Sequence, residues 1–270
     1  MHLALYGTST VRTPPTPKTM ETPPEAIPLP DPPSDGVTGL AYLPPNPSPS
    51  LLASTSWDGC IRIHDTQSRT PKATKAMECG PLLSIAAPEI GGLGSSVFAG
   101  GLNGSICMYE IPTATKVVLG RHLGSGMDNK VACSCLAPLS NLLPSSGSGS
   151  GSRDTILASA GWDARFHLWD TRMKNEAAAT VILPAKAYSM DSAGGNTVAV
   201  ATANRRICVI DVRMMTSSSA KATLKQDRES SLKYQTRTIR IFPDGTGFAL
   251  GSIEGRVAIE YFDEEAAEKG

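Results

Sequence analysis

One unit of sequence recurs five times along this chain, and it restricts the possible folds more than any other feature. Each copy has an apolar run, a short polar turn and an alternating run that ends close to an acidic residue. The five copies occupy residues 51–65, 96–110, 155–170, 196–211 and 247–263. Their turns begin at Trp57, Leu102, Trp162, Ala203 and Ile253, at intervals of 45, 60, 41 and 50 residues. The longest interval contains a Gly/Ser-rich stretch, so its underlying spacing is closer to that of the others.

Each copy has the pattern of a β-hairpin. In the first copy, Ile61 and Ile63 alternate with Arg62 and His64 after the turn. A period of two indicates a strand with one buried face. Several turns carry Asp, Asn or Glu followed by Gly, and glycine accepts the positive φ that a tight turn requires.

Further strand-like runs flank the hairpins. One precedes each hairpin, at residues 36–42, 82–86, 131–136, 187–190 and 238–242, and others follow the acid, at residues 115–119 and 178–183. Four strands repeated about every 40–45 residues are typical of a WD40 β-propeller. The sequence therefore predicts an all-β fold with five blades, where WD40 rings most often have seven.

The remaining segments set the domain boundaries. Residues 1–34 are rich in proline, which favours a disordered lead. We expect the propeller over residues 35–263, with a Gly/Ser-rich loop insertion at 141–153 and an acidic tail at 264–270. Five blades leave two interpretations: either the ring is short, or two further units belong beyond Gly270. An unclosed ring would expose an apolar sheet face and a strand edge, which predicts aggregation or poor function.

Composition argues against several classes of function. Lys and Arg number 25, as do Asp and Glu, so no strongly basic surface supports direct binding of nucleic acid. No run of 18 apolar residues occurs, so no membrane partner is expected. Nucleotide-binding, hydrolase and metalloprotease motifs are missing, so we expect no enzyme and no cofactor. Trp169, in the strand ending at Asp170, is predicted to be a core residue.

The cysteines are read as structural. None of the six forms a Cys-x-x-Cys pair, and the four histidines show no zinc-ligand spacing beside them. Cys60, Cys107 and Cys208 lie in apolar runs, so the sequence predicts small buried residues without a metal or a disulfide.

The last forty residues carry the most specific resemblance. The blocks are ESSLKYQTR at residues 229–237 and SIEGRVAIEY at 252–261, supported by SDGV at 34–37, SWDG at 56–59, LWDTR at 168–172 and IDVR at 210–213. Over residues 33 to 263 the chain resembles the Bub-type mitotic checkpoint WD40 family. It also resembles the sister family of mRNA-export, nucleoporin-binding WD40 proteins.

The resemblance implies a non-enzymatic scaffold of the spindle assembly checkpoint. In that family one surface of the ring binds a short GLEBS-type motif of the checkpoint kinase and of its pseudokinase-like relative. Another surface binds phosphorylated repeats of the outer kinetochore scaffold. The location implied is the nucleus, and the kinetochore in mitosis.

The resemblance also implies site residues. Trp57 and Trp162 match tryptophans that contact the motif, and Arg237 matches an arginine that pairs with its glutamate. Lys233 and Tyr234 could line the same groove. Arg256 matches one of the cations that read a phosphothreonine, while the other cation would lie past Gly270. That departure puts phosphopeptide binding by this chain in doubt.

Plainer roles stay open for these residues. Each tryptophan could pack over a blade edge, Arg237 could be a solvated charge, and Arg256 could pair with a nearby acid. The export-type function, with a nucleoporin GLEBS motif as ligand, and a generic WD40 assembly scaffold remain as alternatives.

Overall fold

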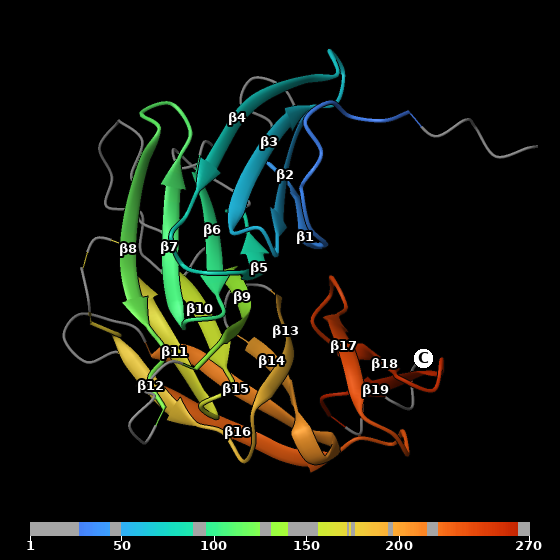
Figure 1. The fold of residues 1–270 in the computed structure, drawn as a ribbon. Coiled ribbons are helices and arrows are strands. Elements are labelled where there is room, and N and C mark those ends of the chain that lie inside the picture. The colour runs from blue at the N-terminus through green and yellow to red at the C-terminus, as the bar shows by residue number, and fades with distance from the viewer. Residues whose placement is uncertain are drawn as a thin grey trace, which may run out of the picture.

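Five antiparallel sheets make up the computed structural model, and they follow one another along the chain as the blades of a propeller (Figure 1). The structure describes residues 27–43, 50–88, 96–124, 131–139, 156–171, 173, 176–193, 197–214 and 221–263. The predicted tail at 264–270, the predicted Gly/Ser-rich insertion at 141–153 and residues 1–26 of the predicted lead lie outside them. In the described part of the chain no helix is long and apolar enough to cross a membrane.

The strands of each blade are consecutive in sequence, and four blades have four strands while the fifth has three. Blade one contains β1 (Val37–Tyr42), β2 (Leu51–Ser56), β3 (Cys60–Asp65) and β4 (Thr70–Ala76). Blade two contains β5 (Leu82–Ala86), β6 (Ser96–Gly101), β7 (Ser105–Glu110) and β8 (Thr115–Arg121). Blade three contains β9 (Cys133–Leu139), β10 (Ile156–Gly161), β11 (Arg165–Asp170) and β12 (Ala179–Ile182). Blade four contains β13 (Ala187–Ala193), β14 (Thr197–Thr202), β15 (Arg206–Met214) and β16 (Lys221–Glu229), and blade five contains β17 (Thr236–Ile241), β18 (Gly247–Ser252) and β19 (Val257–Tyr261).

The five sequence repeats coincide with the second and third strands of the blades, which confirms the predicted propeller. In the first repeat, Leu52 of β2 pairs with His64 of β3, and Thr55 pairs with Ile61. Gly59 closes the intervening turn with φ of 78°, a value that glycine adopts without steric cost. Residues that the period-two pattern predicted to be buried, such as Ile61 and Ile63, have no exposed surface.

The core lies between neighbouring blades, in four apolar clusters. Blades three and four share the largest cluster, which includes Phe166 and Ile210. Blades two and three enclose Phe98 and Trp169 in another. Trp169 is 3% exposed, so the prediction of a core tryptophan is confirmed. Each blade therefore depends on its neighbours for burial of its apolar faces.

Trp169 fits against Gly120 of β8, and this contact gives a test of the packing. A Cβ atom added at Gly120 would lie 2.0 Å from Cζ3 of the indole ring. We expect Gly120→Ala to lower the free energy of unfolding by about 1–3 kcal/mol, because overpacking forces rotamer or backbone shifts. Chemical denaturation measures the effect. Gly36→Ala is the control, since its Cβ would meet only Trp57 Cδ1 at 3.7 Å, and an equal loss in both variants would contradict the prediction.

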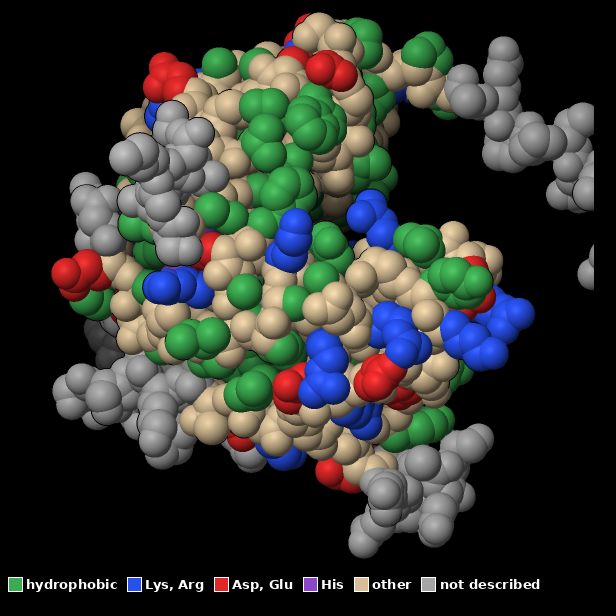
Figure 2. Space-filling model, turned by 60° about the horizontal axis from the view of Figure 1, so that its bottom comes forward, with side chains coloured by type: hydrophobic (Ala, Val, Ile, Leu, Met, Phe, Trp, Pro, Cys, Tyr) green, Lys and Arg blue, Asp and Glu red, His purple; other side chains and the backbone are tan. Residues whose placement is uncertain are grey.

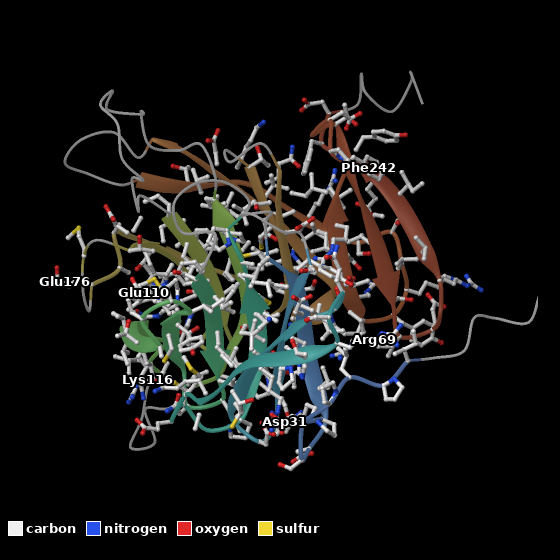
Figure 3. All side chains as sticks on the ribbon, turned by 90° about the horizontal axis from the view of Figure 1, so that it is seen from above. Asp31, Arg69, Glu110, Lys116, Glu176 and Phe242 are labelled. Atoms are coloured by element: carbon white, nitrogen blue, oxygen red, sulfur yellow. The ribbon has the colours of Figure 1, made fainter. Side chains whose placement is uncertain are left out.

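The end of the proline-rich lead lies against blade one. The backbone carbonyl of Pro30 is 2.7 Å from His64 Nε2, and Thr74 Oγ1 donates a hydrogen bond of 2.8 Å to Asp31. Figure 3, seen from above, places Asp31 beside the strands of this blade. Residues 27–34 thus cover part of a sheet face that no other blade covers.

The ring is open between blades one and five, which stand apart in Figure 1. On β1, Leu40 and Tyr42 are 61% and 64% exposed, and on β19, Val257 and Ile259 are 73% and 61% exposed. These side chains lie on the sheet faces opposite those that pack on blades two and four. The first strands of the five blades, β1, β5, β9, β13 and β17, line a central cavity of about 310 Å³.

Candidate functional site

One end of the ring carries the turns between the second and third strands of the blades; we call this end the turn face. Backbone hydrogen bonds join each turn to the connection that leads into its blade: Trp57 donates to Gly36, Leu102 to Pro81, Trp162 to Ala132, Ala203 to Lys186 and Ile253 to Gln235. Figure 2 brings this end forward and shows hydrophobic side chains over one part of it and Lys and Arg side chains over another. The turn face therefore combines apolar and basic surface.

Two tryptophans project from equivalent turns of the turn face. Trp57 of blade one is 45% exposed and Trp162 of blade three is 42% exposed. Large aromatic side chains with this much free surface can bury considerable area against a ligand. Their exposure agrees with the sequence interpretation, which set them apart from the buried Trp169.

Asp58 fixes the turn that carries Trp57. Its carboxylate accepts the backbone N–H of Cys60 at 3.0 Å and pairs with Arg62 Nη1 at 2.8 Å. Burial raises the pKa of Asp58, but these hydrogen bonds and the guanidinium outweigh burial and hold the pKa below its ordinary value. Ser34, at the end of the lead, also donates its backbone N–H to this carboxylate. The turn is thus held by an ionised aspartate with several partners.

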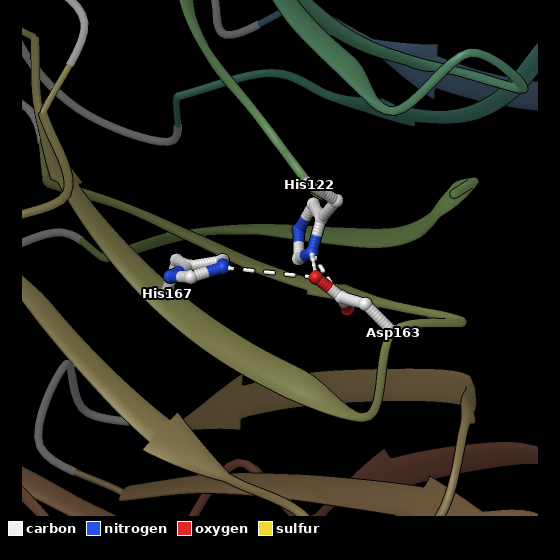
Figure 4. A group of neighbouring side chains, drawn as sticks. All are labelled: His122, Asp163 and His167. Atoms are coloured by element: carbon white, nitrogen blue, oxygen red, sulfur yellow. Dashed lines mark hydrogen bonds and ion pairs between the residues drawn. The ribbon is translucent and has the colours of Figure 1, made fainter. Parts of the chain in front are cut away.

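A buried network fixes the turn that carries Trp162 (Figure 4). His122 Nδ1 donates to the Asp163 carboxylate at 3.0 Å, and His122 Nε2 accepts from the Ser159 hydroxyl at 2.8 Å. Trp169 Nε1 donates in turn to Ser159 at 2.8 Å. The ring nitrogens of His122, the Ser159 hydroxyl and the Trp169 N–H all have partners in this network, which is the condition under which a buried polar network stabilises a fold. The network joins the segment that leads into blade three to two strands of that blade and to the turn between them.

Burial and hydrogen bonds together set the protonation states in this network. Burial is the main reason that the pKa of His122 is lowered, although Asp163 opposes the shift. Burial alone would raise the pKa of Asp163, but hydrogen bonds from His122 and His167 lower it well below its ordinary value. A neutral His122 and an ionised Asp163 follow. The ligand atoms of His122, Asp163 and His167 lie within 4.8 Å of one another, as in a metal site, but both nitrogens of His122 already serve the network.

A cavity opens beside Trp162. Its volume is about 330 Å³, and its lining includes Leu123, Val131 and Ala164 together with Arg165. Leu123 is 52% exposed, so apolar surface extends from the indole ring toward the connection between blades two and three. Lys186 Nζ lies 6.0 Å from the centre of the Trp162 ring, within the range of a cation–π contact. The cavity can accept an apolar side chain next to positive charge.

The other predicted peptide-contacting residues lie where the chain passes from blade four to blade five, with Lys233 and Tyr234 in the connection and Arg237 on β17. Lys233 and Arg237 are exposed, and Tyr234 is 55% exposed. Neither cation forms an ion pair with another residue that the structure describes. The neighbouring turn belongs to the same surface, because Arg205 donates to the Leu232 carbonyl at 3.1 Å. The structure thus places these three residues on the turn face, on different blades from the tryptophans.

Arg256 follows the turn of blade five. Its side chain is 72% exposed, and its Nε lies 3.6 Å from the Glu254 carboxylate. The ion pair with a nearby acid, the plainer of the two roles considered for this residue, is therefore present. The Arg256 side of this ion pair is open to solvent, which weakens the pair, so Glu254 does not prevent Arg256 from meeting an anionic ligand.

Sequence reasoning missed three residues of this site: the buried His122, which holds a turn, and Leu123 and Lys186, which lie beside Trp162. His122 and Asp163 are 41 residues apart, so no local spacing connects them. Lys186 and Leu123 lie in connections that carry no repeat signal. The only sequence feature that Lys186 and Leu123 share is their position shortly after the last strand of a blade.

Comparisons with known proteins support the same fold. Residues 29–65 match the WD40 family model described as "WD domain, G-beta repeat". The crystal structure of the computationally designed Ika8 protein superposes with a TM-score of 0.56 at 15% identity, covering 83% of this chain and 58% of that one, which bears on the fold alone.

Two relatives indicate which kind of WD40 protein this chain resembles. The "Mitotic checkpoint protein bub3" of Dictyostelium discoideum is 34% identical over 237 residues, which cover 87% of this chain and 62% of the relative. The "Poly(A)+ RNA export protein" of Schizosaccharomyces pombe is 33% identical over 238 residues, which cover 87% of this chain and 59% of the relative. The chain thus spans about three fifths of the length of these proteins. The repeat, the five-bladed sheet order and these two matches together show a WD40 β-propeller that is similar to Bub3-type mitotic checkpoint proteins and, to nearly the same degree, to RNA-export proteins.

Proposed function

We propose that this protein is a non-enzymatic scaffold of the spindle assembly checkpoint that binds GLEBS-type motifs on its turn face. The observation that carries the proposal is the presence of two exposed tryptophans, Trp57 and Trp162, on equivalent turns of one surface. The ligands proposed are the motifs of the checkpoint kinase and of its pseudokinase-like relative. The relatives named as mitotic checkpoint proteins support this choice.

The chemistry of the turn face fits a short peptide that contains both apolar and acidic residues. The indole rings and the cavity beside Leu123 would take apolar side chains. Arg237 would bind a carboxylate of the ligand, because a guanidinium presents two parallel donors to it, and Lys233 and Tyr234 would line the same groove. Peptide recognition through aromatic anchors and a guanidinium needs no chemical step, which is consistent with a scaffold.

Binding of phosphorylated kinetochore repeats is the second part of the proposal. Arg256 is the cation offered for it, because its exposed guanidinium suits a phosphate group. Such a bridge between kinase and kinetochore would place the protein in the nucleus, and at the kinetochore in mitosis. Direct contact with nucleic acid is not part of this proposal.

An export function is the second candidate. It is supported by the relative named as a poly(A)+ RNA export protein, which has nearly the same identity to this chain. In this case the turn face would hold the GLEBS motif of a nucleoporin. The two candidates share a binding surface and differ in the peptide.

Competition between peptides separates the candidates. Labelled GLEBS peptides from a checkpoint kinase and from a nucleoporin are titrated with the full chain, and fluorescence anisotropy gives each Kd. Tighter binding of the kinase peptide supports the checkpoint scaffold. Exclusive binding of the nucleoporin peptide supports the export function, and binding of neither leaves only the generic assembly scaffold.

Charge reversal at Arg237 tests the polar part of the site. We expect Arg237→Glu to weaken the kinase peptide at least about tenfold, because a carboxylate would then face a carboxylate. Arg69→Glu is the matched control, since Arg69 is an exposed arginine in the turn between β3 and β4, at the opposite end of the blade. The role assigned to Arg237 is wrong if both variants bind like the unmodified protein.

A further inference from the structure

Two cysteine side chains meet in the core between blades one and two. Cys79 lies in the connection from β4 to β5, and Cys107 lies on β7, 28 residues further along the chain. Their sulfur atoms are 2.6 Å apart. Both residues are buried, with 2% and 0% of their surface exposed, and both are free thiols.

This separation is unusual for two thiols. Non-bonded heavy atoms come to rest about 3.5–4.0 Å apart, whereas a disulfide bond is about 2.0 Å long. The fold thus holds the two sulfurs between contact distance and bonding distance, with each aimed at the other. Formation of a bond would require the two sulfurs to move from 2.6 Å to about 2.0 Å apart.

The surroundings make the two thiols unequal. The contact with Cys107 is the main cause that lowers the pKa of Cys79, and Lys116 and Arg121 lower it further against the effect of burial. The pKa of Cys107 is raised, by the contact with Cys79 and by burial. The ammonium group of Lys116, a residue labelled in Figure 3, donates a hydrogen bond of 3.2 Å to the carbonyl of Met77. Met77 precedes Cys79 by two residues, so this positive charge lies near Cys79. Cys79 is therefore the sulfur that carries more thiolate.

One side of the pair is close to solvent. Gly80, which follows Cys79, is exposed, and no atom lies within 4 Å of the position that its Cβ would take. A small oxidant can therefore approach the connection at Cys79, whereas Cys107 is enclosed by the strands of blade two.

We propose that Cys79 and Cys107 are a redox pair that a peroxide converts into an intramolecular disulfide. The Cys79 thiolate attacks one oxygen of hydrogen peroxide, the O–O bond breaks, and a sulfenic acid and hydroxide form. The Cys107 sulfur then attacks Cys79 Sγ, the S–O bond breaks, and hydroxide leaves and takes up the thiol proton. Two thiols and one peroxide give one disulfide and two water molecules, so the two electrons lost by sulfur reduce the peroxide.

The bond would join the two blades next to the turn face. Met77, two residues before Cys79, donates its backbone N–H to Gly59 in the turn that carries Trp57. A link from Cys79 to β7 would therefore fix the junction beneath this tryptophan. The assignment rests on the two thiols and is independent of the peptide proposed for the turn face.

Peptide mapping of the folded protein tests the assignment. The native chain is treated with hydrogen peroxide, its remaining thiols are alkylated, and it is cleaved after glutamate, which places Cys79 in fragment 79–89 and Cys107 in fragment 90–110. We expect these fragments to be recovered joined, with a loss of two hydrogen atoms, and to separate on treatment with dithiothreitol. The assignment is overturned if peroxide leaves both cysteines alkylated, or if it oxidises Cys79 alone to a sulfinic acid.

Two variants test whether Cys107 resolves the sulfenic acid and whether the pair is specific. In Cys107→Ser, the sulfenic acid at Cys79 has no resolving thiol and should be trapped by dimedone. Cys208→Ser is the matched control, because Cys208 is buried in blade four, has no sulfur contact within the described part of the chain, and has a pKa that burial raises to about 12. This control should form the Cys79–Cys107 link as the unmodified chain does. A link that disappears in Cys208→Ser would show disulfide exchange rather than a dedicated pair, and would also overturn the assignment.

Discussion

Replacing both Trp57 and Trp162 with alanine is expected to weaken the binding of a GLEBS-type peptide severely while the propeller stays folded. Each indole leaves more than two fifths of its surface free on the turn face. Tryptophans that fill a pocket in a partner typically contribute about 2–4 kcal/mol each when they are truncated. The double variant should therefore raise Kd by about 100-fold or more, and each single variant by at least about tenfold. Isothermal titration calorimetry measures the three values.

The control for this experiment is an exposed aromatic residue away from the turn face. Tyr42 of β1 is 64% exposed on the open face of blade one, so Tyr42→Ala removes a comparable free ring. It should leave Kd unchanged, and all the variants should melt close to the unmodified protein because the rings they lose are not in the core. Unchanged binding by the double variant would remove the basis of the proposed function.

Asparagine at position 163 is expected to produce the largest loss of stability among the polar substitutions. Asp163 accepts from His122 in a fully buried network, and its side chain is only 1% exposed. An amide in its place leaves His122 with a neutral and poorly matched partner. We expect a loss of about 2–3 kcal/mol in the free energy of unfolding, measured by urea titration at pH 7. Asp244→Asn is the control, because Asp244 also caps a turn, through Thr246 at 3.0 Å, but does so in solvent.

The same network predicts how stability depends on pH. Since the pKa of His122 is lowered on folding, the unfolded chain binds its proton first, and stability should begin to fall below about pH 6.5. Since the pKa of Asp163 is also lowered, a further loss should appear below about pH 4. Asp163→Asn should remove its part of the second loss while the first remains. A decline below pH 4 that is as steep in the variant as in the unmodified protein would contradict the ionised state of Asp163.

The hairpins of this fold could be predicted from local sequence because their determinants are local. The alternation of Ile61 and Ile63 with polar residues and the glycine at position 59 fix two strands and a turn within fifteen residues. The exposure of Trp57 and Trp162 followed from the same argument, since a side chain next to a turn aspartate lies at the tip of a hairpin. The burial of Trp169 followed from its place inside a strand.

The parts that escaped prediction depend on contacts between distant segments. Asp163 lies in the predicted turn that begins at Trp162, and only the fold brings His122 to it from the preceding connection. The ion pair of Arg256 with Glu254 was one of two possibilities, and side-chain geometry was needed to show that it forms. The approach of Cys79 to Cys107 likewise depends on the packing of two blades, which the spacing of cysteines does not encode.

Because four apolar clusters join five blades, the blades are not equally protected against local unfolding. Blade three is covered on both sides, by the clusters that contain Phe98 and Ile210, whereas blades one and five are covered on one side only. Opening should therefore begin at the two outer sheets and move inward, and the backbone amides of β10 and β11 should be the slowest to exchange their protons with water. Unfolding would then proceed inward from blades one and five, and blade three, which holds Trp162, would be the last blade to lose its structure.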